Sequence, residues 1–483
     1  MPKRAHEVTI VWLRNDLRLA DNRALAAALS HGGAVVPVYV LDEAAAGRWA
    51  PGGASRWWLH HSLTSLAKAL EAKGSRLILR RGSAADILAE IAAELQARQI
   101  VCQRRYEPWA MAQEREVKSR LDAAGIDLKR FGGALLVEPE QIKTQSGAPY
   151  KVYTPFWRAL ASSLEASAPL KAPKAIPAPA TWPKSQTPTS WALLPRKPDW
   201  AKGFAAHWQP GEAGAMARLD SFLDEHAARY GEQRNRPDLP GTSRLSPHLA
   251  HGEISPRLIW WRVTSERARA NGADTELETF LKEIVWREFC AHLLFHFPQF
   301  PDAPFRSEFA RFGWARDEAA LKAWQRGRTG YPIVDAGMRE LWSTGWMHNR
   351  VRMIVASFLI KDLLIPWQDG QAWFWDTLVD ADLASNAASW QWVAGSGADA
   401  APYFRIFNPV TQGHKFDPDG DYVRRYVPEL ARLGNRDVHQ PFAAGDLSLA
   451  AAGVRLGETY PHPLVDHAHA RTRALAAFTR LSA

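Results

Sequence analysis

A proline-rich segment separates two parts of the chain that have different hydrophobic patterns. Residues 163–202 are dominated by Pro, Ala, Ser and Lys and include "APLKAPKAIPAPATWPKSQTPTS". Proline lacks a backbone N–H and fixes φ, so this stretch cannot form a regular helix or a central strand. We expect a long connection between two domains, because 483 residues are too many for one hydrophobic core.

Before this segment, apolar runs alternate with stretches of helical spacing. The runs predict buried strands at residues 8–13, 34–41, 76–79 and 100–102. The helical spacing predicts helices at residues 22–29, 58–71 and 84–97. This alternation is typical of a Rossmann-like α/β domain with a parallel sheet. Arg14-Asn15-Asp16-Leu17-Arg18 follows the first run, so the G-x-G-x-x-G fingerprint of dinucleotide-binding folds is absent there.

After the segment, the pattern is helical throughout. The predicted helices cover residues 215–229, 277–295, 318–325, 335–343, 349–364 and 371–379. We therefore expect an all-α second domain. The expected boundaries are 1–131 for the α/β domain, 132–203 for the linker and 204–483 for the helical domain.

The composition excludes several classes of protein. Cys102 and Cys290 are the only cysteines; they can neither ligate a four-thiolate iron–sulfur cluster nor build a disulfide framework, so a reducing cytoplasm is expected. No uncharged run is long enough to span a bilayer, and residues 1–7 have no apolar signal core. The formal charge of +9 suits a polyanionic partner, although many basic proteins bind no nucleic acid.

The helical part contains four polar segments that make poor core material. The first, residues 241–248, places hydroxyls, a glycine and Arg244 before Pro247, a residue suited to the first turn of a helix. Backbone N–H groups, hydroxyls and a guanidinium can cradle a phosphate or pyrophosphate. A plain N-cap by the serine before the proline is the alternative interpretation.

The second segment, residues 280–289, is expected to be helical. Glu283, Trp286 and Arg287 then share one face, where a carboxylate beside an indole could hydrogen-bond a flat ring that stacks on the indole. The alternative is an ordinary Glu–Arg pair on a half-exposed face.

The third segment, residues 345–353, combines an amide, a guanidinium and a thioether on one helix face, which makes a plausible ligand wall. Its members are Asn349, Arg352 and Met353.

The fourth segment, "DADLASNAASWQW" at residues 380–392, is the strongest pointer to a cofactor. If it is helical, Asp382, Asn386 and Trp390 line one face. Two acids, an amide and two indoles are costly to bury unless they meet a polar heteroaromatic partner. The 22 tryptophans against 10 tyrosines also indicate a role in stacking or electron transfer beyond packing.

Taken together, these segments resemble the photolyase/cryptochrome family in their order and separation. The resemblance covers essentially the whole chain, from "VWLRNDLRLADN" through "YTPFWRAL", "GTSRLSPHLAHGEISP", "KEIVWREF" and "GYPIVDAGMRELWSTGWMHNRVRM" to "DADLASNAASWQW" and "YFRIFNP". The motifs "RWWLHHSL" and "WVAGSGADA" are most similar to class III dimer photolyases.

The resemblance implies a U-shaped FAD in the helical domain. The phosphates and the ribityl chain would be held by Tyr230, Thr242, Ser243, Arg244, Leu245 and Ser246. The other residues implied to bind FAD are Glu283, Arg287, Asn349, Arg352, Asp380, Asp382 and Asn386. Arg352 and Asp380 would pair beside the isoalloxazine, with Asp382 on its polar edge. Asn386 would face flavin N5, where plant-type cryptochromes carry an acid, so it favours repair over signalling.

The resemblance further implies an electron-transfer chain from the flavin to the surface. Its indoles would be Trp390, Trp367 and Trp314, each of which could alternatively be ordinary packing. Light would excite reduced FAD, whose electron opens the ring of the substrate and then returns.

The implied substrate is a pyrimidine dimer flipped out of double-stranded DNA, since photolyases belong to the enzymes that extrude their target base. The implied catalytic residues are Glu283, Trp286, Asn349, Met353, Trp392 and Asn386, with Arg234, Trp286, Met353 and Trp392 contacting DNA. Enzymes of the six-four photoproduct carry histidines where Asn349 and Met353 stand, and the single-strand-preferring subgroup usually has tyrosines at such positions as Trp286 and Trp392. Glu283 would donate a hydrogen bond to a thymine carbonyl, a role that requires a protonated carboxyl group.

An antenna chromophore is implied less directly. The segment at residues 104–110, "RRYEPWA", departs from the class I folate pocket and is more similar to class III enzymes, which use methenyltetrahydrofolate. Trp57 and Glu107 are the candidate contacts, and a deazaflavin or no antenna remains the alternative.

Arg405, Lys415 and Arg424 are candidates for the DNA groove, or they are simply solvated charges. We expect a cytoplasmic monomer without metal, and a cryptochrome-like photoreceptor is the competing interpretation.

Overall fold

The computed structural model describes residues 7–164, 167–267, 274–399 and 404–481, and the chain divides into two compact units. Unit 1 is built from Met1–Ala228, Ser243–Pro298 and Val379–Asp382. Unit 2 is built from Arg229–Thr242, Gln299–Leu378 and Leu383–Ala483. Each unit thus joins segments that are far apart in the sequence, and the domain boundaries expected near residues 131 and 203 remain a prediction.

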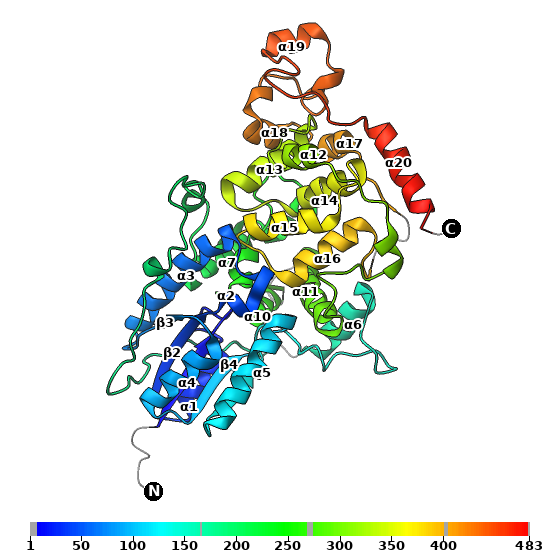
Figure 1. Ribbon diagram of the computed structural model, residues 1–483. Coiled ribbons are helices and arrows are strands. Elements are labelled where there is room, and N and C mark those ends of the chain that lie inside the picture. The colour runs from blue at the N-terminus through cyan, green and yellow to red at the C-terminus, as the bar shows by residue number, and fades with distance from the viewer. Residues whose placement is uncertain (1–6, 165–166, 268–273, 400–403, 482–483) are drawn as a thin grey trace. The chain divides into compact units, whose positions relative to one another are not determined.

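Unit 1 contains a five-stranded parallel sheet with strand order β3-β2-β1-β4-β5 (Figure 1). The strands are β1 (Val8–Leu13), β2 (Ala34–Leu41), β3 (Ile78–Arg81), β4 (Gln99–Gln103) and β5 (Asp127–Phe131). The first two match the predicted strands residue for residue, and β3 and β4 lie within two residues of their predictions. Strand β5 was not predicted, because three of its five residues, DLKRF, are charged and leave no apolar run.

Both faces of this sheet are buried, which is why its central strands read as continuous apolar runs. Helices α1 (Arg23–Ser30) and α3 (Gly53–Glu71) cover one face, where Val11 and Val35 belong to their core cluster. Helices α4 (Ala84–Leu95) and α5 (Pro108–Ala123) cover the other face, where Ile10 belongs to the second core cluster. Successive strand residues therefore point to opposite cores.

Further helices complete unit 1. They are α2 (Glu43–Ala46), α6 (Tyr153–Ser163), α7 (Glu212–Glu225), α9 (Ser246–Ala250), α10 (Pro256–Arg267) and α11 (Asp274–His296). Between α6 and α7 the described residues contain no α-helix or strand, only short 3-10 turns, as the proline content predicts. The predicted helix at residues 215–229 ends earlier, at Glu225, and a 3-10 turn follows at Ala227–Arg229.

Unit 2 is helical, with no strand among its described residues. Its α-helices are α8 (Tyr230–Gln233), α12 (Glu318–Gln325), α13 (Pro332–Thr344), α14 (Asn349–Ser357), α15 (Trp367–Thr377), α16 (Leu383–Ala394), α17 (Pro409–Phe416), α18 (Asp421–Tyr426), α19 (Asp446–Ala452) and α20 (His467–Thr479). Helix α13 packs against α14 and α18, and α15 packs against α16 (Figure 1). Over the described part of the chain, no helix is long and apolar enough to cross a membrane.

Three helix predictions for unit 2 need correction. The helix predicted at residues 349–364 is α14 followed by a π-helical turn at Phe358–Asp362, a change of hydrogen-bond pattern that hydrophobic spacing does not reveal. The helix predicted at residues 371–379 is α15, shifted to start at Trp367 after Pro366. Asp382 precedes α16, so only Asn386 and Trp390 of the predicted polar face lie on that helix.

Candidate functional site

The carboxyl edge of the sheet in unit 1 is occupied by arginines. In an open α/β sheet a ligand crevice is usual where the strand order reverses, which here is between β1 and β4. Arg14 follows β1; its Nη1 donates to Glu114 Oε1 at 3.0 Å, and its guanidinium lies 4.4 Å from the centre of the Trp12 ring. Arg18 is also buried and donates to Gln103 Oε1 at 3.0 Å. Protein side chains therefore fill this crevice.

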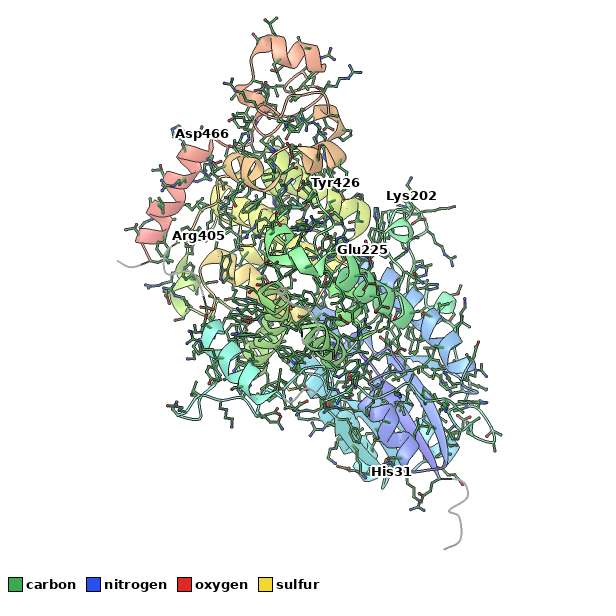
Figure 2. All side chains as sticks on the ribbon, turned by 180° about the vertical axis from the view of Figure 1, so that it is seen from behind. His31, Lys202, Glu225, Arg405, Tyr426 and Asp466 are labelled. Atoms are coloured by element: carbon green, nitrogen blue, oxygen red, sulfur yellow. The ribbon has the colours of Figure 1, made fainter. Side chains whose placement is uncertain are left out.

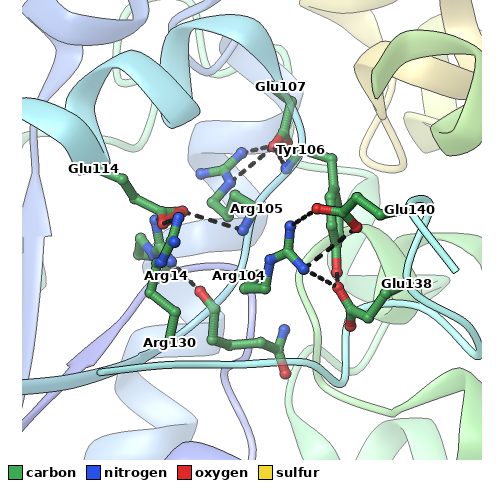
Figure 3. A network of polar contacts seen from close by, with 10 residues as sticks. Arg14, Arg104, Arg105, Tyr106, Glu107, Glu114, Arg130, Glu138 and Glu140 are labelled. Carbon is green, nitrogen blue, oxygen red and sulfur yellow. Dashed lines mark hydrogen bonds and ion pairs between the residues drawn. The ribbon is translucent and has the colours of Figure 1, made fainter. Parts of the chain in front are cut away.

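A charged network includes the antenna candidate Glu107 (Figure 3). Arg105 Nη2 donates to Glu107 Oε1 at 2.5 Å, and Tyr106 Oη donates to Glu138 Oε2 at 2.7 Å. Burial alone would raise the pKa of Glu107, but Arg105 outweighs it, so this pKa lies below its ordinary value. The other candidate, Trp57, is buried against His61 and Phe204, and no contact joins it to Glu107 among the described residues.

The segment before α9 does not form a plain helix cap. Leu245 stands at the N-cap position without a side-chain cap, so the N-cap interpretation is wrong. Ser246 Oγ instead donates to Asp380 Oδ2 at 2.6 Å, which ties two of the predicted cofactor residues together. Arg244 has a φ of 50°, in the left-handed region that non-glycine residues seldom adopt, so the turn is strained at this candidate residue. Thr242 and Ser243 are half-buried.

Helix α11 carries Glu283, Trp286 and Arg287, all half-buried. Arg287 Nη1 donates to Ala134 O at 2.8 Å, and no ion pair joins it to Glu283 in the described structure, so the Glu–Arg pair interpretation is wrong. Trp286 lies flat against Tyr153, with ring centres 3.7 Å apart and an interplanar angle of 4°. Tyr153 belongs to the "YTPFWRAL" motif, but no signal in the sequence connects it to Trp286.

Glu288, one residue further along α11, was also missed. Its Oε2 accepts from the N–H of Leu136 at 2.7 Å, and its side chain is 1% exposed. Burial raises the pKa of Glu288 to about 8, although the neighbouring Arg287 opposes this shift. The carboxyl group is therefore protonated over much of the neutral range.

Helix α14 presents Asn349 and Met353 four residues apart on one face. Asn349 is exposed and Met353 half-buried, with its Sδ 3.6 Å from Arg350 Nη1. The helix begins with His348 as N-cap, and the backbone N–H of His348 donates to the buried Glu340 Oε2 at 3.2 Å.

The side chain of the predicted flavin contact Arg352 is hydrogen-bonded to the backbone just before the start of α14. Its Nε donates to Met347 O at 2.8 Å, and its guanidinium lies 5.8 Å from the centre of the Trp346 ring. The two predicted residues Tyr230 and Arg234 contact each other, with the guanidinium 5.5 Å from the tyrosine ring centre.

Asn386 on α16 has a defined amide orientation. Its Nδ2 donates to Gln371 O on α15 at 3.0 Å, and the side chain is 9% exposed. Because a carbonyl must face the NH₂ group, Oδ1 points the other way, and among the described residues it accepts no hydrogen bond. Trp392, six residues along the same helix, is half-buried.

The three predicted electron-transfer indoles do not have one another as ring neighbours in the described structure. Trp390 packs edge-on against Phe374 at 5.0 Å and Trp324 at 6.3 Å. A Cβ at Gly370 would lie 2.1 Å from the Trp390 ring, so only glycine allows this close approach of α15 and α16. Trp367 is buried at the start of α15, and half-buried Trp314 contacts Phe312 at 4.3 Å.

The surface candidates for the DNA groove differ in their surroundings. Arg424 donates to Leu433 O at 2.7 Å, and Lys415 lies 5.3 Å from the centre of the Phe416 ring. Arg405 is exposed and its carbonyl accepts from the buried Lys361 at 2.5 Å (Figure 2). Arg424 is thus engaged within the protein, and Arg405 lies at the protein surface.

Comparison with known proteins supports a single family. Residues 280–480 match the family described as the FAD binding domain of DNA photolyase, and residues 9–179 match the family described as DNA photolyase. A deoxyribodipyrimidine photo-lyase of Agrobacterium fabrum is 56% identical over 97% of this chain and 97% of that protein. Cryptochrome-1 of Arabidopsis thaliana is 38% identical over 98% of this chain and 70% of that protein.

The fold comparison agrees with this assignment. A crystal structure of a class III photolyase from Agrobacterium tumefaciens superposes with a TM-score of 0.95 at 55% identity, and the superposition covers 99% of this chain and 98% of that one. The α/β and helical parts, the motifs and these full-length matches all agree. The chain belongs to the photolyase/cryptochrome family.

Proposed function

We propose that this protein repairs cyclobutane pyrimidine dimers in double-stranded DNA by light-driven electron transfer from reduced FAD, as a deoxyribodipyrimidine photo-lyase of class III. The observation that carries the proposal is the full-length likeness to the Agrobacterium fabrum photo-lyase, at 56% identity. The basic formal charge of +9 suits a DNA partner.

FAD supplies the electron donor of this chemistry when it is bound. The proposed residues for its phosphates and ribityl chain are Tyr230, Thr242, Ser243, Arg244, Leu245 and Ser246. Those proposed for its ring system are Glu283, Arg287, Asn349, Arg352, Asp380, Asp382 and Asn386. The Asn386 Oδ1 supports this assignment, because Gln371 holds the amide nitrogen and leaves the oxygen free for an N–H donor such as that of a reduced flavin.

For the substrate, we assign stacking to Trp286 and Trp392 and side-chain contacts to Glu283, Asn349 and Met353, with Arg234 at the DNA backbone. Glu283 contributes a hydrogen bond to a thymine carbonyl as negative charge develops on it. The stack of Tyr153 on Trp286 supports the stacking role of Trp286, because an indole already fixed in orientation loses little conformational freedom when a base stacks on it.

The remaining assignments follow the class III likeness. Trp390, Trp367 and Trp314 carry electrons between the flavin and the surface; the burial of Trp390 and Trp367 and the partial exposure of Trp314 support this direction. The antenna is methenyltetrahydrofolate, with Trp57 and Glu107 as contacts. The protein acts as a monomer in the cytoplasm.

The decisive experiment is an absorbance assay on purified, photoreduced protein with a dimer-containing duplex. Recovery of thymine absorbance under blue light, and none in the dark or with oxidised flavin, is the expected result. No recovery with FAD bound and photoreducible would instead favour a cryptochrome-like photoreceptor, to which the 38% identity with Arabidopsis cryptochrome-1 also points. Protein purified without flavin would overturn both functions.

Two variants test the assigned roles separately. Glu283→Ala should lower the repair yield while FAD content stays unchanged, and an unchanged yield would remove Glu283 from the mechanism. Trp390→Phe should slow photoreduction of the flavin but leave repair by chemically reduced protein intact. Normal photoreduction of that variant would show that electrons take another route.

A further inference from the structure

Tyr153 is the first residue of α6, and its phenol ring lies flat against the indole of Trp286. The ring centres are 3.7 Å apart and the planes differ by 4°. Most aromatic pairs in proteins are offset or edge-to-face with larger separations, so this close parallel contact covers one face of the indole. Only the opposite face of Trp286 can then receive another flat ring.

The phenol is also fixed through its hydroxyl group. Tyr153 Oη donates to the carbonyl of Lys282 at 2.6 Å. That carbonyl belongs to the peptide bond that leads to Glu283, and in an α-helix it also faces the N–H of Trp286. Phe289 packs edge-on against both stacked rings, at 5.9 Å from Tyr153 and 5.8 Å from Trp286. Tyr153 itself is 8% exposed, so water does not compete strongly for these contacts.

We infer that Tyr153 is a positioning residue for lesion binding: it holds the indole of Trp286 in the orientation that receives the dimer, with one base stacking on the indole face opposite Tyr153. This inference rests on the proposed function, because it assigns Trp286 to the substrate. Its physical basis is pre-organisation, since a side chain that is already ordered costs less to immobilise on binding.

The alternative is that Tyr153 only stabilises the fold, and a matched control separates the two roles. Phe156 lies one turn further along α6, is 1% exposed and packs against Phe289 at 5.3 Å. In the described structure it makes no ring contact with Trp286. Phe156→Leu therefore removes a similar buried ring from the same cluster without freeing the indole.

The experiment measures dissociation constants of the FAD-loaded protein for a dimer-containing duplex and for an undamaged duplex, together with repair per absorbed photon at saturating DNA. Tyr153→Leu should weaken binding of the dimer duplex about five- to tenfold, the loss expected for one side chain that must be ordered on binding. Its affinity for undamaged DNA and its repair yield at saturation should stay unchanged. Tyr153→Phe keeps the stack and should stay within about twofold of the wild type, and Phe156→Leu should keep the full preference for damaged DNA.

A double-mutant cycle provides the sharpest readout. In a Trp286→Leu background, Tyr153→Leu should cost no further affinity for the dimer duplex, because it acts only through the indole. The positioning role would be overturned if Tyr153→Leu, like Phe156→Leu, weakened binding of the damaged and the undamaged duplex equally. It would also be overturned if the affinity losses of Tyr153→Leu and Trp286→Leu were additive in the double variant. If Tyr153→Leu does not retain FAD, Tyr153→His keeps a smaller planar ring, and the same comparison applies to it. A wild-type protein that neither prefers nor repairs dimers would overturn the proposed function itself, which distinguishes that failure from a failure confined to Tyr153.

Discussion

Helices α11 and α14 both carry residues proposed to contact the substrate, but their surroundings support them differently. On α11, the residues proposed for the site, Trp286 and Arg287, are held by an aromatic stack with Tyr153 and by a hydrogen bond to the backbone of Ala134. On α14, one buried carboxylate, Glu340 of α13, accepts from the backbone of His348 at the start of the helix. The same carboxylate accepts from Tyr422 Oη at 2.7 Å.

This difference predicts unequal tolerance to change. An aromatic contact or a single hydrogen bond to the backbone contributes modestly to the free energy of unfolding, and its loss leaves few buried polar groups without a partner. A buried carboxylate that serves several donors is different, because removing it strands all of them in a low-dielectric interior. Substitutions around α14 should therefore destabilise the protein more than substitutions around α11.

The largest expected effect comes from Glu340→Ala. The substitution removes the acceptor shared by the buried His348 N–H and Tyr422 O–H, and should lower the free energy of unfolding by about 3 kcal/mol. Urea unfolding followed by circular dichroism measures this loss. Glu318→Ala on α12, where the side chain is 90% exposed, is the matched control and should have a far smaller effect. Equal losses in the two variants would break the comparison.

The second effect is a pH dependence that belongs to α11. Burial raises the pKa of Glu288 from its ordinary value of 4.5 to about 8, so the folded protein holds a proton that the unfolded chain releases. Stability from this group is therefore complete below pH 4.5 and is lost as the pH rises towards 8. Between about pH 6 and pH 8 the wild type should lose about 2 kcal/mol relative to Glu288→Gln. Parallel pH profiles of the two proteins would show that Glu288 does not titrate in this range.

The smallest effect compares two tyrosines that share Glu340. Tyr422 Oη donates at 2.7 Å and Tyr426 Oη at 3.5 Å. Tyr422→Phe should therefore cost about 1 kcal/mol of unfolding free energy, and Tyr426→Phe less than half of that. Both values come from the same urea titrations. A larger loss for Tyr426→Phe would mean that the carboxylate depends on the outer tyrosine instead.

Much of the fold could be predicted from the sequence, whereas the supports of the site could not. Strands β1 and β2 were found at their correct residues, because strands buried on both faces are continuous apolar runs. The contacts of Glu288 and Glu340 were missed, because their partners lie 152 and 82 residues away in the chain. No local periodicity reports such pairs.

The candidate residues themselves were largely identified by motif, since polar and aromatic groups on helical spacing are unusual core material. What the motif did not reveal is how each side chain is oriented. Trp286 has one face covered, and Asn386 has its amide nitrogen turned towards Gln371. These orientations leave the opposite indole face of Trp286 and the Oδ1 atom of Asn386 for a ligand.

The sequence by itself determined an α/β part, a proline-rich connection and a helical part, because helix and strand periods and proline chemistry act over a few residues. Only the tertiary structure decided that Arg287 donates a hydrogen bond to Ala134 instead of pairing with Glu283, and that Tyr153 stacks on Trp286. The physical reason is that a buried polar or aromatic group takes whichever partner the packing brings within reach, and packing joins residues that the chain keeps far apart.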